Sequence, residues 1–217
     1  GMYHWKEEDG LPDYTINAIT QSGDGYLWFG TFSGLVRFDG VRFTLYTSAN
    51  TPALPSDYVW ALLNDGKGSL WIGTGGGLTR LYGRQFSVWT AEDGLPVSSV
   101  RALHQDRAGR LWVGFRRGGL AVWEGNRFEK FPGSEAFAGS DVSAILMDRA
   151  GVVWVGTGDG LFRWAGERFE RLSGKGGLAA GKVHALLEDS QGALWIGTEE
   201  GLFRHHAGRF RRLGSES

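Results

Sequence analysis

The sequence contains no cysteine, only 5 prolines and no uninterrupted apolar run long enough to span a bilayer. The lack of cysteine excludes disulfide bonds, thiol catalysis and cysteine-based zinc sites. The 23 lysines and arginines are balanced by 24 aspartates and glutamates, so the basic footprint that general nucleic-acid binding needs is missing. We therefore expect no nucleic-acid partner and no membrane segment in this chain, and its start shows no charged-then-apolar leader.

Glycine and tryptophan, in contrast, are abundant, with 36 and 10 residues in a chain of 217. Many aromatic residues, together with glycine that follows no collagen period, favour short strands joined by tight turns. Much of this composition comes from one phrase: "LWIGTEEGLFR" begins at Leu194, and near-copies begin at residues 27, 70, 111 and 153. The chain is therefore built from five repeats.

The tryptophans of these phrases are spaced by 43, 41, 42 and 41 residues, at Trp28, Trp71, Trp112, Trp154 and Trp195. Around each of them the same residue types return at fixed offsets. Glycine lies three residues before and two after the tryptophan, alanine lies ten before, and isoleucine or valine lies twelve before. Aspartate lies six residues before it in four repeats, and Ser22 takes this place in the first. All five repeats thus share one register.

The pattern of each repeat predicts four short strands separated by turns. An Asp-x-x-Gly turn joins the first two strands, and no segment sustains the 3.6-residue period of a helix. A repeated four-stranded unit of about 42 residues is typical of a β-propeller. We predict an all-β fold, a β-propeller of five four-stranded blades with almost no helix, in a single domain over residues 1–217. The repeats span approximately residues 13–46, 56–89, 97–131, 139–172 and 180–213.

The start of the chain predicts one further strand. Residues 2–6, which precede "DGLP", align with the outer strand that begins at Phe86 and precedes another "DGLP". The fifth repeat already has its own outer strand, from Phe210 to Leu213. The extra outer strand at 2–6 therefore either lies outside a five-bladed ring or indicates that the repeats are part of a larger ring or assembly.

Positions that all repeats share are assigned to the architecture. We expect the recurrent tryptophan and phenylalanine to pack between blades, and the recurrent aspartate to form turns. An arginine follows "GL" in four repeats, and we expect it to pair with an acidic residue of the neighbouring blade. Its four positions are Arg37, Arg80, Arg163 and Arg204.

The phrases "DGLP", "D..G.LW.GT" and "GL.R" resemble the two-component regulator propeller repeats, over essentially the whole chain. The resemblance implies a ligand-sensing module in signal transduction, the extracytoplasmic and therefore periplasmic sensor part of hybrid histidine kinases. It also implies that binding at the sensor alters the association of receptor chains. This chain would supply the recognition step.

No motif in the sequence indicates catalysis. The five histidines lack metal-ligand spacing, and His205 and His206 point to opposite faces of a strand. Neither a nucleophile elbow nor a phosphate-binding loop is present. We therefore expect no catalytic residues, no metal site and no cofactor, and a non-catalytic binding function. A protein-protein interaction scaffold is the main alternative, and a lyase or hydrolase with a site on the propeller axis is a third.

Candidate binding residues are sought where the five repeats differ in chemistry. One variable position lies between the recurrent isoleucine or valine and the alanine, and another lies two residues earlier. Both belong to the start of the innermost strand, beside the mouth of the central channel, where the turns between second and third strands also open. We expect a small-molecule or carbohydrate ligand there, with Asn17, Tyr58, Trp60, Arg101, Arg116 and His184 as leading contacts.

The residue types suit such a ligand, because tryptophan and tyrosine stack on sugar faces and arginine binds carboxylates or phosphates in a fork. The alternative is that these residues are solvated side chains of the rim. The third repeat adds several basic residues, with Arg107 and Arg110 predicted at the opposite end from Arg116. These indicate either exposed charge or a local contact with an anion or a partner. Self-association or a protein partner could also use the surplus outer strand.

Overall fold

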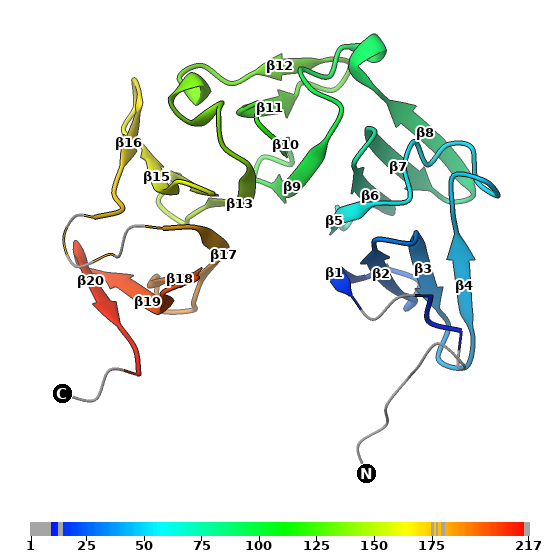
Figure 1. The fold of residues 1–217 in the computed structure, drawn as a ribbon, viewed down its shortest axis with the longest axis horizontal. Helices are drawn as coiled ribbons and strands as arrows, with labels where there is room; N and C mark the ends of the chain where they lie inside the picture. The colour runs from blue at the N-terminus through cyan, green and yellow to red at the C-terminus, as the bar shows by residue number, and fades with distance from the viewer. Residues whose placement is uncertain (1–9, 13–14, 175, 177, 179–180, 215–217) are drawn as a thin grey trace. The chain divides into compact units, whose positions relative to one another are not determined.

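The computed structural model describes residues 10–12, 15–174, 176, 178 and 181–214. Within them, twenty strands form five four-stranded antiparallel sheets, the blades of a β-propeller fold (Figure 1). In each sheet the strands follow one another in chain order, for example β1-β2-β3-β4. The predicted all-β class and four-stranded blades are confirmed. The expected outer strand at 2–6 lies outside the described residues.

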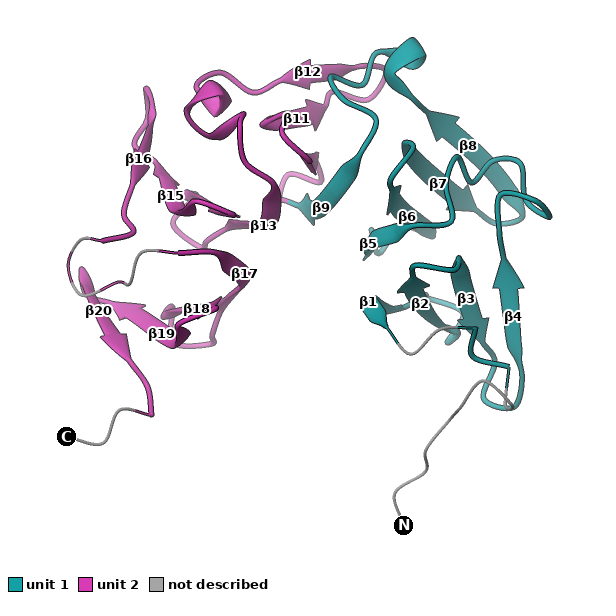
Figure 2. Ribbon diagram, in the orientation of Figure 1, with its two compact units in different colours: residues 1–105 teal, residues 106–217 magenta. Residues whose placement is uncertain are grey.

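Two compact units make up the chain, residues 1–105 and 106–217 (Figure 2). The first unit contains two complete blades and the first strand of the third. Its strands are β1 (Ile16–Gln21), β2 (Leu27–Thr31), β3 (Leu35–Phe38), β4 (Phe43–Tyr46), β5 (Val59–Asn64), β6 (Ser69–Thr74), β7 (Leu78–Tyr82), β8 (Gln85–Trp89) and β9 (Val100–Gln105). The single domain over residues 1–217 that the sequence suggests stays a prediction.

The second unit contains the rest of the third blade and two complete blades. Its strands are β10 (Leu111–Phe115), β11 (Leu120–Trp123), β12 (Phe128–Lys130), β13 (Val142–Met147), β14 (Val153–Thr157), β15 (Gly160–Trp164), β16 (Phe169–Arg171), β17 (Val183–Glu188), β18 (Leu194–Thr198), β19 (Gly201–His206) and β20 (Arg209–Arg212). Helix is limited, in the described part of the chain, to two 3-10 turns, η2 (Ala91–Asp93) and η3 (Ser134–Phe137).

The apolar cores lie between blades, which explains why the second strands are apolar at both strand phases. In the first unit one core combines Trp28 and Leu35 of the first blade with Val59, Leu70 and Ile72 of the second. The second unit repeats this arrangement between the fourth and fifth blades, around Trp154, Val183 and Ile196. The recurrent tryptophan thus packs between blades, as expected, because a single sheet cannot bury both of its faces.

A glycine on one blade and a valine on the next set the distance between blades. A Cβ built at Gly30 would lie 2.7 Å from Cγ1 of Val59, and one at Gly73 would lie 2.7 Å from Cγ1 of Val100. The second unit has the same pairs, Gly114 with Val142 and Gly156 with Val183. None of these four glycines has a positive φ, so they are required for the space that they leave. The sheets can approach this closely only because the second strand carries no side chain there.

Replacing Gly156 by alanine puts a Cβ 2.6 Å from Cγ1 of Val183, well inside van der Waals contact. We expect the free energy of unfolding in urea to fall by about 1–3 kcal/mol, because an added methyl group overpacks the interface between the blades.

Gly197→Ala is the matched control in the fifth blade, since a Cβ there meets its first protein atom, Cβ of Ala185, only at 3.7 Å. Its expected effect is below about 0.5 kcal/mol. Equal losses in the two variants would contradict the interblade role of the glycine.

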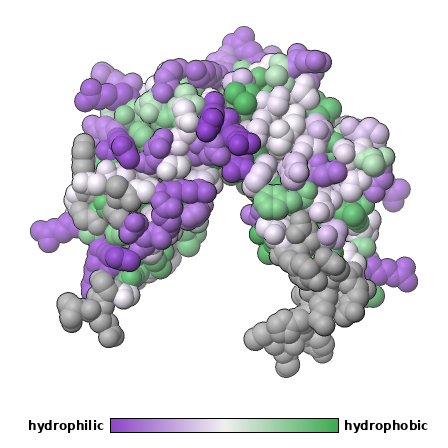
Figure 3. Space-filling model, viewed as in Figure 1, coloured by the Kyte–Doolittle hydropathy of each residue, from purple (hydrophilic) through white to green (hydrophobic). Residues whose placement is uncertain are grey.

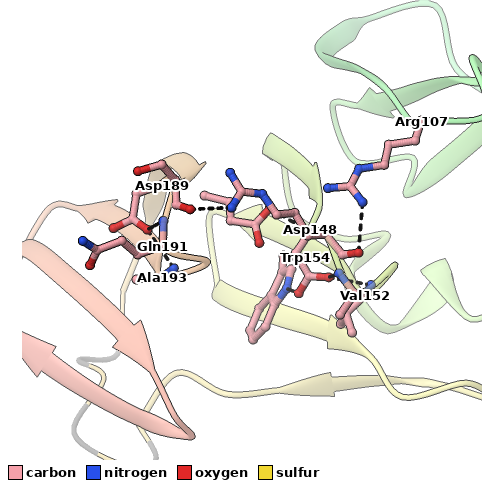
Figure 4. Close-up of polar contacts among 11 residues, drawn as sticks. Arg107, Asp148, Val152, Trp154, Asp189, Gln191 and Ala193 are labelled. Atoms are coloured by element: carbon pink, nitrogen blue, oxygen red, sulfur yellow. Dashed lines mark hydrogen bonds and ion pairs between the residues drawn. The ribbon is translucent and has the colours of Figure 1, made fainter.

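The recurrent aspartate does more than form the turn between the first two strands. Asp148 accepts hydrogen bonds from the backbone N–H of Val152 at 2.9 Å and from Nε1 of Trp154 at 2.8 Å (Figure 4). Asp189 does the same in the fifth blade, with Nε1 of Trp195 at 2.8 Å. One carboxylate therefore closes the turn and satisfies the indole N–H of the tryptophan that packs between blades.

Arginines one residue after this aspartate connect successive turns of the second unit. Nη1 of Arg107 donates to the carbonyl oxygen of Arg149 at 3.1 Å, and Nη1 of Arg149 donates to that of Ser190 at 2.6 Å (Figure 4). Arg149 also lies 3.9 Å from the carboxylate of Glu188. Each arginine thus bridges the gap to the next blade at this end of the sheets.

The arginine after "GL" corrects one expectation from the sequence. Arg163 bonds Glu170 at 3.1 Å, and the two residues are register partners within one sheet. Arg80 donates to Oγ of Ser69 at 2.7 Å and lies over the ring of Trp71, also within its own sheet. These arginines therefore bond within their own blade, because the strand register brings them opposite its recurrent tryptophan.

The aspartate of the third repeat predicts a measurable pH dependence of stability. The side chain of Asp106 is 1% exposed and accepts hydrogen bonds from Nε1 of Trp112 and Nε of Arg110. Burial acts to raise the pKa of Asp106, but the bonds from Trp112 and Arg110 outweigh it and hold the pKa below the usual 3.8. We expect Asp106→Asn to lower the free energy of unfolding at neutral pH by about 1–3 kcal/mol.

A carboxyl group with a lowered folded-state pKa stabilises the fold above its unfolded-state pKa, and this contribution is lost as the pH falls through the folded-state value. The difference between wild type and Asp106→Asn should therefore shrink below a pH of about 4. Urea unfolding at several pH values measures it, and Glu167→Gln, in an exposed turn, is the control. A difference that does not change with pH would show that the charge of Asp106 is not involved.

Candidate functional site

The variable residue of the first strand lies at a β-bulge. In four blades the pairing of the first two strands shifts register on either side of it, for example between Ile16 and Ala18 and between Val59 and Ala61. Asn17, Trp60 and His184 therefore take bulge positions. A residue at a bulge has no partner on the neighbouring strand, and its side chain does not follow the regular alternation between the two faces of the sheet. The sequence placed these residues at the strand starts, but it did not predict the bulge.

In the first unit the structure brings four of the variable side chains together, and we call them the aromatic–arginine cluster: Phe32, Tyr58, Trp60 and Arg101. The guanidinium carbon of Arg101 lies 3.6 Å from the ring centroid of Trp60, a cation–π contact. Phe32 meets Trp60 edge-on, with centroids 4.9 Å apart, and meets Tyr58 at 6.0 Å. The guanidinium thus lies over the indole face, and Tyr58, which Phe32 also contacts, is 57% exposed.

Phe32 is the member of this cluster that is missing from the predicted site residues. It lies in the turn between β2 and β3, and Tyr58 precedes β5 of the next blade. A signal was present in the sequence, because the first repeat is the one that has an aromatic residue at this place in the turn. Sequence alone could not show that a turn of one blade contacts the first strand of the next.

The turns between second and third strands lie beside the strand starts of their own blades. The backbone N–H of Gly75 donates to the carbonyl of Tyr58 at 2.9 Å. Glu199 donates in the same way to Lys182 at 3.2 Å. Both groups of variable positions therefore occupy one end of each blade, which is the arrangement that the candidate site requires.

Asn17 has a structural role that the sequence did not predict. Its Nδ2 donates to the carbonyl oxygen of Val59 on the next blade at 2.9 Å. Ser143, at the equivalent position in the fourth blade, donates through Oγ to the carbonyl of Val183. A variable position can thus serve the contact between blades, and Asn17 is less available to a ligand than Tyr58.

The two predicted site residues of the second unit are Arg116 and His184, and both are exposed. Nε of Arg116 lies 3.9 Å from Oδ2 of Asp141, which also forms an isolated β-bridge with it. No contact between Arg116 and His184 is recorded among the described residues. Arg116 and His184 belong to the second unit, whereas the aromatic–arginine cluster belongs to the first.

Most of the extra basic residues of the third repeat have acidic or carbonyl partners. Arg110 pairs with Asp106, Arg107 reaches the carbonyl of Arg149, Arg127 pairs with Glu129 and Lys130 pairs with Glu135. The exposed pairs Arg127–Glu129 and Lys130–Glu135 contribute little stability, but they neutralise the charge locally. For these four residues the pairing favours exposed charge over an anion site.

His205 is held by aromatic contacts, with ring centroids 4.5 Å from Phe210 and 5.3 Å from Trp154. Burial lowers the pKa of His205, and Arg163 and His206 lower it further. Within the described part of the chain, no three histidine, aspartate or glutamate side chains are grouped so that they could hold a metal ion.

Figure 3 shows hydrophilic residues over much of the visible face of both units, with hydrophobic residues in smaller areas between them. Large apolar side chains are exposed at a few positions, among them Tyr58 at 57% and Tyr82 at 55%. No helix in the described residues is long and apolar enough to cross a membrane.

The sequence matches the two component regulator propeller family five times, at residues 10–33, 53–76, 94–117, 136–159 and 177–200. Each match begins before a first strand and ends in the turn after the second strand, so it contains both groups of variable positions. No curated protein matches the chain significantly.

Solved structures share the fold. The extracellular domain of a putative hybrid two component system from B. thetaiotaomicron has a TM-score of 0.75 at 22% identity, over 90% of this chain and 28% of that one. Virginiamycin B lyase from Staphylococcus aureus has a TM-score of 0.70 at 15% identity, over 92% of this chain and 70% of the lyase. This chain thus spans 28–34% of the length of the two-component relatives, and identities this low show the fold alone.

Proposed function

We propose that this chain, which belongs to the two component regulator propeller family, is a non-catalytic module that recognises a small polar or carbohydrate-like ligand. The site is the aromatic–arginine cluster at the end of the blades where the repeats differ. We also propose that the chain lies outside the cytoplasm, as the resemblance to the family implies. The similar fold of extracellular domains from hybrid two component systems supports it.

One observation carries this proposal: Arg101 is stacked on Trp60 at 3.6 Å beside an exposed tyrosine ring. The five N–H groups of a guanidinium form a planar fork, and stacking on an indole fixes that plane before a ligand arrives. Preorganisation of this kind lowers the entropic cost of binding. Packing between blades explains the aromatic residues that recur in all repeats, but it does not require the pair of Trp60 and Arg101.

The chemistry of the cluster suggests the ligand class. Tyr58 offers an apolar ring face with a hydroxyl, which suits the C–H face and hydroxyls of a sugar ring. Arg101 suits a carboxylate or another planar acceptor at the edge of that ring. An acidic sugar combines both features, so uronic acids and their oligosaccharides are the first ligands to examine.

The test is a thermal-shift screen of neutral and acidic sugars, followed by calorimetric titration of those that raise the melting temperature. We expect Tyr58→Ala and Arg101→Lys each to weaken binding by about tenfold or more, since the first removes the stacking face and the second the planar fork.

Tyr82→Ala is the matched control, because Tyr82 is as exposed as Tyr58 but lies at the other end of its blade, where β7 turns into β8. It should bind within about twofold of wild type. Equal losses at Tyr58 and Tyr82, or full binding by Arg101→Lys, would rule out the cluster as the site.

Other outcomes of the same screen identify other functions. Consumption of a ligand would favour an enzyme, as in the lyase that shares the fold. If no small molecule raised the melting temperature and the chain self-associated in solution, a protein-interaction scaffold would be favoured. In this account the chain supplies recognition, and any signal passes to segments of the receptor outside this chain.

A further inference from the structure

We propose that a second site, the cleft between the first two blades, binds an organic carboxylate with an aromatic or aliphatic body. The cleft has a volume of about 560 Å³ and lies wholly within the first unit. Its lining includes Ser22, Trp28, Arg37, Tyr46, Arg84 and Phe86. This site lies at the opposite end of the blades from the aromatic–arginine cluster, and it goes beyond the proposed function.

The first repeat departs from the other four at one position in the lining of this cleft, and it lacks the bridging arginine of the third and fourth repeats. Ser22 replaces the recurrent aspartate, and Gly23 takes the position of Arg107 and Arg149. In the second unit those arginines bridge the gap to the next blade through bonds to Arg149 and Ser190. Gly23, like Gly66 of the second repeat, has no side chain to form such a bridge, and the cleft lies between the first and second blades.

Arg37 carries the argument for an anion. It belongs to the set of arginines after "GL", but it has no hydrogen bond or ion pair with any described residue, and its Nε is buried. Its guanidinium carbon lies 4.6 Å from the ring centroid of Tyr26, which replaces the serine that accepts from Arg80 in the second blade. The stacking positions the charge beside the cleft, where Asp39 is close enough that Arg37 contributes to lowering the pKa of Asp39.

A comparison with the fifth blade shows what is missing in the first. Arg204 also has a buried Nε without a partner, but Asp189 is close enough that Arg204 contributes to lowering the pKa of Asp189. In the first blade the indole of Trp28 donates to Oγ of Ser22 at 2.9 Å, so no carboxylate occupies this place. A ligand carboxylate would restore the charge that the recurrent aspartate supplies in the other repeats.

The lining of the cleft carries more positive than negative charge. Arg84 is exposed, lines the cleft and has no ion pair with a described residue. Asp24 also lines it and accepts a hydrogen bond from Ser22, while Asp39 accepts from the backbone of Val41 and Arg42. The lining itself thus has two guanidinium groups against one carboxylate.

The walls of the cleft indicate that the part of the ligand beyond its carboxylate is apolar. The rings of Trp28 and Tyr46 are 5.7 Å apart, and those of Tyr46 and Phe86 are 6.4 Å apart, so they form a continuous aromatic wall. Leu70 and Leu81 complete the apolar lining. The volume is within the range of small-molecule sites, and apolar walls with a few placed polar groups are typical of such sites.

The probe for this site is 3-phenylpropionate, compared with the neutral 3-phenylpropan-1-ol by calorimetric titration of the whole chain. We expect saturable binding of the acid, and binding of the alcohol weaker by about tenfold or more, because only the acid meets the arginines. Equal affinities, or no saturable binding of the acid, would overturn the proposal.

The decisive variant combines Ser22→Asp with Asp24→Gln, which copies the pattern of Asp189 and Gln191 in the fifth repeat at constant net charge. It moves a carboxylate to the place facing Arg37, so affinity for the acid should fall by about tenfold or more without loss of thermal stability. Asp24→Asn alone should strengthen binding, since it removes the one acid in the lining. A double variant that binds as wild type does would overturn the proposal.

Tyr58→Ala separates this site from the proposed sugar site. It should leave the affinity for 3-phenylpropionate unchanged, because Tyr58 does not line the cleft. A negative result for one of the two sites therefore does not contradict the proposal for the other.

Discussion

Each blade is fitted to the next at a glycine whose missing side chain is replaced by a valine methyl group of the neighbour. The pairs Gly30–Val59, Gly73–Val100, Gly114–Val142 and Gly156–Val183 recur along the chain. Because the fit is so close, the first strand of one blade can pack on the second strand of the previous blade in only one alignment, with the valine opposite the glycine. The buried tryptophan, the aspartate that binds its indole and the turn that this aspartate closes are all positioned by that register.

A repeated architecture makes departures from the repeat informative. In the other repeats an aspartate binds the turn and the indole, and where Ser22 replaces it Nε of Arg37 is buried without a hydrogen bond. An arginine bridges to the next blade from the third and fourth repeats, whereas the first repeat has Gly23 at this position, beside the cleft. At the other end of the blades, Trp60 and Arg101 take a position that Asn17 and Ser143 use for interblade hydrogen bonds. Function is therefore inferred from the side chains that the interface between blades does not use.

The fold could be predicted from the sequence because a period of about 42 residues and two-residue alternation are local properties of the chain. The site could be predicted only in part. Tyr58, Trp60 and Arg101, which the sequence places at strand starts, are connected through contacts between blades, including those of Phe32. The interblade bond of Asn17, and the pairing of Arg163 within its own blade, depend on bulges and strand register that no residue pattern specifies. For the same reason the sequence showed Ser22 as an exception without showing the cleft.

The shared tryptophans serve the architecture, and we propose that Trp60 serves recognition. The most direct measurement is the set of indole N–H signals in nitrogen-edited NMR spectra, followed during titration with the acidic sugar that raises the melting temperature. The account predicts that the Trp60 signal shifts and saturates, while the indoles bonded to Asp106, Asp148 and Asp189 keep their positions. An unmoved Trp60 signal together with shifts at those bonded indoles would contradict it.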